Sequence, residues 1–146
     1  MHLLLLYLFC IIVLHLQIIE ERMIYILDYD VDIAFVLNEW LQLNGFNTKS
    51  FTILEQLFQN LTIQHPDCIL LDCRYGKQSL LPGICRTIRN EFKYAGSIII
   101  TSTTTVSGKD LQRCDADRSM IKPFDFNGMI DVINEQVEYL DQRCAA

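Results

Sequence analysis

From residue 23 onward, short runs that we interpret as β-strands alternate with stretches of helical periodicity. The five runs are MIYIL (23–27), NTKSF (47–51), CILL (68–71), SIIIT (97–101) and RSMI (118–121). Strands that alternate with helices form a parallel sheet covered on both faces. The sequence therefore predicts a single α/β domain over residues 23–140, since no repeat or linker divides this range.

Three kinds of signal mark the helices between these runs. Apolar residues from Ile33 to Leu41 fall on one face and end before Gly45, which is a good helix stop. Thr52 followed by Glu55 predicts a capping box at the start of the second helix. The other helices are indicated by Ile84 and Ile88, by SGKDLQR (107–113), and by Phe126, Ile130, Ile133, Val137 and Leu140.

The net negative charge of the chain limits the classes of partner that it is expected to bind. The 146 residues carry a formal charge of −6, and no basic stripe suggests direct binding of nucleic acid. Partners are expected to be proteins or a metal ion. The six cysteines have no zinc-site spacing, and several lie in apolar runs, so we expect reduced thiols in a cytoplasmic protein rather than disulfides.

Residues 1–22 form a separate apolar segment in front of the domain. The sequence is almost unbroken apolar from residue 3 to 14, which predicts a helix, but it lacks the basic start and the cleavage site of a signal peptide. Three interpretations stay open: a membrane anchor formed by residues 3–19, an upstream extension of the reading frame, or a helix that packs on a partner. At the other end, residues 141–146 are expected to be a short tail without an output domain.

Polar residues follow the strands at their carboxyl ends. Asp28 follows the first predicted strand, Asp72 the third, Thr101 and Ser102 end the fourth, and Lys122 follows the fifth. In open α/β sheets the ligand crevice lies at these ends, so we expect the side chains to converge.

Clustered carboxylates repel one another unless a cation is close or a proton is taken up. Mg²⁺ suits such a site, because it accepts one or two carboxylates and leaves positions open for phosphate oxygens. A carboxylate can also attack a phosphoryl group to form an aspartyl phosphate. This chemistry indicates a phosphorylation switch rather than an enzyme that turns over a substrate.

The motifs YILDYD, CILLDCR, IIITS and MIKPF follow one another at a characteristic spacing. With them, residues 23 to about 140 resemble the CheY-like receiver domain of bacterial two-component response regulators. The resemblance implies a doubly wound, flavodoxin-like (βα)5 fold with strand order 2-1-3-4-5. It also implies that Asp72 is the phosphoacceptor, Thr101 the switch hydroxyl and Lys122 the phosphate-pairing lysine.

The same resemblance implies a cofactor and partners. Mg²⁺ would be held by Asp28, Asp72 and the backbone carbonyl of Arg74, with Asp30 as a weaker candidate. Lys122 and Pro123 would be joined by a cis peptide. A histidine kinase or a phosphotransfer protein would supply the phosphate, and the signal would pass to a protein target or through a homodimer.

Three departures from the family pattern leave a degenerate receiver open, which would act as an interaction module without phosphorylation. Tyr29 occupies the position of the usual second acid, and Ser119 the position of the usual aromatic residue on the fifth strand. The stretch DCRYGKQSLLPG (72–83) lacks the usual proline shortly after the phosphoacceptor and is one residue longer.

A rival interpretation is a phosphohydrolase that resembles the haloacid dehalogenases. Asp28 would then be the nucleophile and Asp30 the general acid. That family needs a further acidic pair after the lysine, but residues 123–136 have a helical pattern, and Asp72 would have no role. A plainer alternative for Asp30 or Asp32 is to cap the first helix of the domain.

Overall fold

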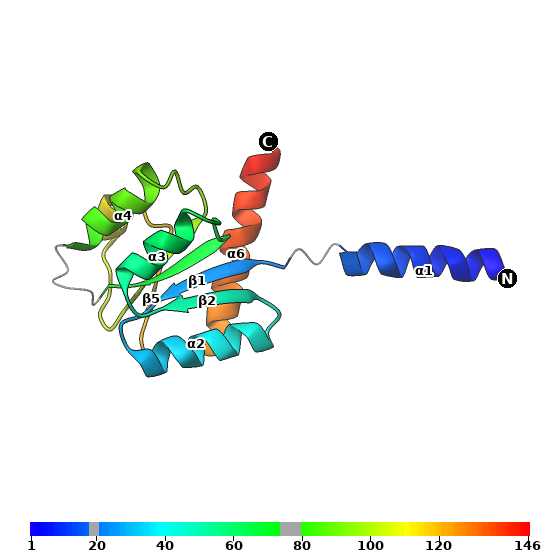
Figure 1. The fold of residues 1–146 in the computed structure, drawn as a ribbon, viewed down its shortest axis with the longest axis horizontal. Helices are drawn as coiled ribbons and strands as arrows, with labels where there is room; N and C mark the ends of the chain where they lie inside the picture. Colours follow the sequence, from blue (N-terminus) through cyan, green and yellow to red (C-terminus); the bar gives the residue numbers. More distant parts are fainter. Residues whose placement is uncertain (18–20, 74–79) are drawn as a thin grey trace.

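The computed structural model describes residues 1–17, 21–73 and 80–146, with the side chains of residues 1–11 in the first of these ranges. Five parallel strands form one sheet in the order β2-β1-β3-β4-β5, as the resemblance implied (Figure 1). The strands are β1 Met23–Leu27, β2 Asn47–Phe51, β3 Cys68–Asp72, β4 Ser97–Ser102 and β5 Arg118–Ile121. The helices are α1 His2–Gln17, α2 Val31–Leu43, α3 Leu54–Leu61, α4 Leu81–Asn90, α5 Gly108–Cys114 and α6 Phe126–Ala145.

Alternate residues of the central strands face two different helical layers. Ile24 and Ile26 of β1 pack in one core cluster with residues of α2 and α6, whereas Tyr25 and Leu27 pack in another with residues of α3, α4 and α5. All four side chains are essentially inaccessible to solvent. Burial of an aliphatic side chain of this size contributes roughly 1.5–3 kcal/mol, so both faces of the sheet stabilise the fold.

Helix α2 begins with a side-chain cap. Asp30 accepts hydrogen bonds from the backbone N–H groups of Asp32 and Ile33 at 3.0 and 3.2 Å. This confirms the prediction that one of the two acids caps the helix.

The capping box predicted at Thr52 is wrong. The N-cap of α3 is Ile53, which makes no side-chain capping bond. The carbonyl of Phe51 accepts a hydrogen bond from the backbone N–H of Asp28 at 3.1 Å, so the chain stays with the sheet through residue 51. The helix consequently starts one residue too late for Glu55 to occupy the third helical position that a capping box needs.

Helix α6 extends past Leu140, the predicted end of the domain, and continues through Ala145. Its last turns are held to the start of the sheet, because the guanidinium group of Arg22 pairs with Asp141 of α6 and with Asp67. Most of the expected tail is therefore helical.

Helix α1 confirms the apolar N-terminal helix (Figure 1). Its described side chains, those of residues 2–11, are all exposed to solvent. None of the helices in the described ranges combines the length and the apolar character that are needed to cross a membrane.

The six cysteines are all free thiols, and only Cys10 and Cys144 are exposed. Burial raises the pKa of the Cys68 and Cys85 thiols far above the ordinary 9.0. We therefore expect an alkylating reagent at about pH 8 to modify two thiols of the folded protein, and the other four only after denaturation. Intact mass measures the number, and rapid modification of a third thiol would contradict this assignment.

The same burial has a consequence at alkaline pH. The folded protein holds these two protons more tightly than the unfolded chain, so ionisation favours the unfolded state once the pH exceeds 9.0. The free energy of unfolding is expected to fall from that pH upward, as measured by urea denaturation.

Candidate functional site

Three charged side chains meet at the carboxyl end of the sheet. Asp28 follows β1, Asp72 ends β3, and Lys122 follows β5. The Lys122 Nζ lies 2.5 Å from Asp28 Oδ2 and 3.2 Å from Asp72 Oδ1. Because a single ammonium contacts both carboxylates, the two carboxylates lie side by side, as the sequence predicted.

This cluster is removed from solvent. Asp28 is 1% exposed, Asp72 is 0% exposed, and the Lys122 side chain is 7% exposed. Charges in such surroundings interact more strongly than at the surface, and their removal from water carries a cost. The three side chains together carry two negative charges and one positive charge. Their excess of negative charge favours the approach of a further cation.

The hydroxyl residues of β4 lie on the strand next to Asp72. Thr101 is the register partner of Asp72, is 2% exposed, and accepts a hydrogen bond at its carbonyl from the backbone N–H of Cys73 at 2.9 Å. The Ser102 hydroxyl accepts from the backbone N–H of Thr104 at 3.1 Å, which ties it to the turn after β4. Thr101 is therefore the better placed of the two beside Asp72.

The structure places the other expected ligands differently. Asp30 uses its carboxylate Oδ1 to cap α2, and its backbone N–H donates to Asp28 Oδ1 at 3.0 Å. The ring of Tyr29 packs against the core cluster beneath α3, α4 and α5. Arg74, whose carbonyl was expected to bind the metal, lies outside the described residues. The Lys122–Pro123 peptide is cis, as the resemblance implied.

The cluster offers carboxylate oxygens as possible metal ligands. Within the described residues, no group of three or more His, Cys, Asp or Glu side chains is arranged to hold a metal. Mg²⁺ commonly binds through one or two carboxylates and fills its remaining positions with water and phosphate oxygens. The adjacent carboxylates of Asp28 and Asp72 fit this requirement, since their oxygen donors are of the hard type that Mg²⁺ prefers.

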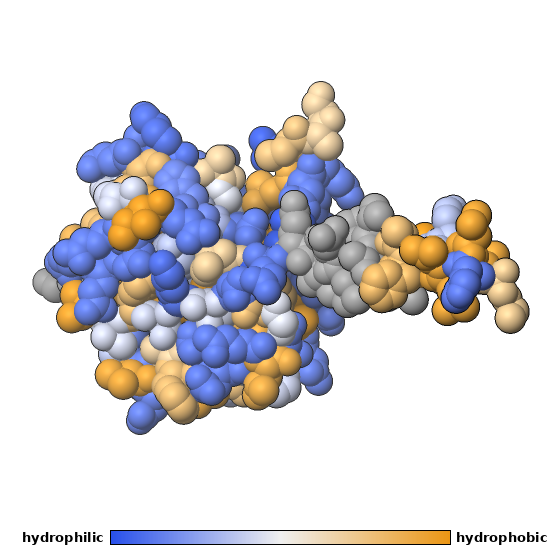
Figure 2. All heavy atoms as spheres, turned by 45° about the vertical axis from the view of Figure 1, so that its right-hand side comes forward, coloured by the Kyte–Doolittle hydropathy of each residue, from blue (hydrophilic) through white to orange (hydrophobic). Residues whose placement is uncertain are grey.

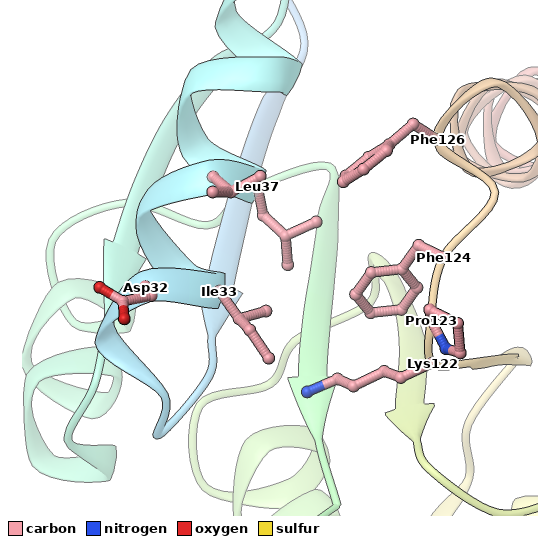
Figure 3. Close-up of a pocket in the computed structure, with 8 residues that line it drawn as sticks. Asp32, Ile33, Leu37, Lys122, Pro123, Phe124 and Phe126 are labelled. Carbon is pink, nitrogen blue, oxygen red and sulfur yellow. The ribbon is translucent and has the colours of Figure 1, made fainter.

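An apolar pocket of about 300 Å³ lies beside the cluster. Figure 3 shows Ile33 and Leu37 of α2 across this pocket from Phe124 and Phe126, with the side chain of Lys122 extending along its floor. Sequence reasoning did not identify the pocket. The signal was present in the pair of phenylalanines that follows Lys122 and Pro123.

A second, more polar pocket of about 290 Å³ lies against β4, α4 and α5. Its lining includes Cys73 next to Asp72, Ser102 at the end of β4, and the charged residues Asp110 and Arg113 of α5. Neither Asp110 nor Arg113 was among the site residues predicted from the sequence.

The fold built around this cluster is the CheY-like receiver fold of response regulators. Chemotaxis protein CheY4 of Vibrio cholerae superposes with a TM-score of 0.71 at 15% identity, over 79% of this chain and 98% of that protein. A response regulator from Thermotoga maritima gives a TM-score of 0.68 at 18% identity, over 80% and 98%. The BeF3-activated receiver domain of DrrB gives 0.64 at 20% identity, over 80% and 97%. No family model and no curated protein matches the sequence.

Proposed function

We propose that residues 23–140 act as a receiver domain that accepts a phosphoryl group on Asp72 from a histidine kinase or a phosphotransfer protein. One observation carries this proposal: Asp28, Asp72 and Lys122 form a buried cluster at the carboxyl edge of a CheY-like sheet, in which the lysine pairs with both carboxylates. The modified domain then signals through a protein-interaction face.

The side chains have distinct roles in this reaction. A carboxylate oxygen of Asp72 attacks phosphorus, and the bond between phosphorus and the donor breaks, so the donor leaves with the bonding electron pair. Lys122 stays close to the new phosphoryl oxygens and offsets their charge. The Thr101 hydroxyl, on the neighbouring strand, donates to one of them. Mg²⁺, held by Asp28 and Asp72, would neutralise further negative charge on the phosphoryl group.

Two observations favour the receiver over a hydrolase with Asp28 as nucleophile. Both oxygens of Asp28 already accept hydrogen bonds, from the backbone N–H of Asp30 and from Lys122. Asp30, the general acid of that alternative, caps α2 with its carboxylate. The second candidate is an interaction module that works without phosphorylation, and the packing of Tyr29 into the core where the family usually has an acid favours it.

The full chain incubated with Mg²⁺ and acetyl phosphate tests the proposal. We expect intact mass spectrometry to show one added phosphoryl group, and borohydride reduction followed by peptide mapping to locate it at Asp72. Modification at Asp28 would instead support the hydrolase. The interaction module would be supported if the protein gains no phosphate and its thermal unfolding does not respond to beryllium fluoride, the activator of the DrrB receiver.

A further inference from the structure

Helix α1 presents apolar side chains on every side. Leu3 is 86% exposed, Leu5 64% and Phe9 65%, and Figure 2 shows hydrophobic residues over the helix where it projects from the domain. Four consecutive leucines, residues 3–6, already point in four directions around a helix of 3.6 residues per turn. An isolated helix of this kind needs a surrounding that covers its whole circumference.

The absence of charged side chains from this segment indicates what covers the helix. Residues 1–19 contain no Asp, Glu, Lys or Arg. A groove on a folded partner takes up one face of a helix and leaves the opposite face in water. Hydrocarbon, by contrast, covers all sides and accepts a segment that has no Asp, Glu, Lys or Arg side chain.

The polar contacts of the domain begin directly after this segment. Glu21 accepts a hydrogen bond from the Asn47 side chain at 2.7 Å, and Arg22 pairs with Asp67 and Asp141. The change from a segment without Asp, Glu, Lys or Arg to ion-paired residues of the domain is completed within residues 20–22. Such a boundary matches the boundary between the interior and the surface of a bilayer.

We propose that α1 binds a lipid bilayer through its apolar side chains and so tethers the domain to a membrane surface. Sixteen helical residues are about 24 Å long, whereas the hydrocarbon core is about 30 Å thick, so the helix enters the bilayer without crossing it. Because the chain has a net charge of −6, anionic lipid headgroups are not expected to attract it, and the proposed binding rests on apolar contact. This inference does not depend on the proposed phosphorylation.

Flotation of the full chain with vesicles of neutral phosphatidylcholine tests the proposed membrane binding. The two exposed thiols provide matched sites for an environment-sensitive nitrobenzoxadiazole probe: Cys10 on α1, in a Cys144→Ser background, and Cys144 on α6, in a Cys10→Ser background. We expect both proteins to float with the vesicles. The emission of the Cys10 probe should shift to the blue and that of the Cys144 probe should not. Salt at about 1 M should release neither protein, because apolar contact is not screened.

Charged substitutions supply the control. Leu5→Lys/Phe9→Lys should weaken vesicle binding by at least about 100-fold, whereas Ile63→Lys, at a 78% exposed position of the domain, should leave it unchanged. The proposal is overturned if the parent chain stays with the unbound protein, or if it sediments as an oligomer that the double substitution dissolves, since α1 would then associate with other copies. Phosphate incorporation in the same samples reports separately on the proposed function.

Discussion

Replacing Asp72 with asparagine is expected to abolish phosphate incorporation and to leave the domain at least as stable as the parent protein. The amide of asparagine has no carboxylate oxygen to attack phosphorus, so loss of the modification should be complete. The substitution also removes one of the two buried negative charges that share the Lys122 ammonium. A one-to-one pair remains, and the free energy of unfolding should not decrease. Intact mass and urea denaturation measure the two effects.

The comparison with Asp28→Asn separates a nucleophile from a residue that supports it. Both variants remove one buried carboxylate beside Lys122, so their effects on stability should be similar. Asp28→Asn should weaken phosphorylation and its dependence on Mg²⁺, but the remaining phosphate should still map to Asp72. Persistence of full modification in Asp72→Asn would show that another residue is the acceptor.

Lys122→Met is expected to lower the free energy of unfolding by about 3–5 kcal/mol, the usual effect of removing one partner from a buried ion pair. The ammonium contacts both carboxylates, and methionine fills a similar volume without a charge, so two negative charges lose their shared counterion. Phosphate incorporation should fall as well. Urea denaturation measures the stability, and the mass assay measures the transfer.

Two further variants show whether the lost charge causes the loss of stability expected for Lys122→Met. Lys109→Met removes an exposed lysine, so the free energy of unfolding should change by less than about 0.5 kcal/mol. The double substitution Asp72→Asn/Lys122→Met should recover part of the loss, because only one buried carboxylate then lacks the ammonium. Equal stability of the single and double variants would indicate that the loss comes from packing around the lysine stem.

Much of the sheet and of the charged cluster could be predicted, for a physical reason. Central parallel strands need continuous apolar runs, so MIYIL, CILL and SIIIT marked β1, β3 and β4 closely, and the more polar runs NTKSF and RSMI completed the alternation with helices. Polar residues directly after these strands had to lie at one edge of the sheet. Asp28, Asp72 and Lys122 were found in this way.

Details that depend on the path of the chain in three dimensions could not be predicted. The start of α3 was misplaced because the hydrogen bond that holds Phe51 of β2 comes from Asp28, which follows β1 and is far from Phe51 along the chain. The continuation of α6 is accompanied by the ion pair of Asp141 with Arg22, which lie 119 positions apart along the chain. The double use of Asp30, as helix cap and as donor to Asp28, also became visible only in the folded protein.

The origin of Lys122 in the segment after the last strand has a consequence for synthesis on the ribosome. A growing chain that ends before residue 118 carries both aspartates but neither β5 nor the lysine that joins them. Its acidic residues cannot yet form the closed cluster. The charged cluster therefore closes only when the sheet is complete, and a chain truncated before residue 118 is expected to lack the lysine on which the proposed phosphorylation depends.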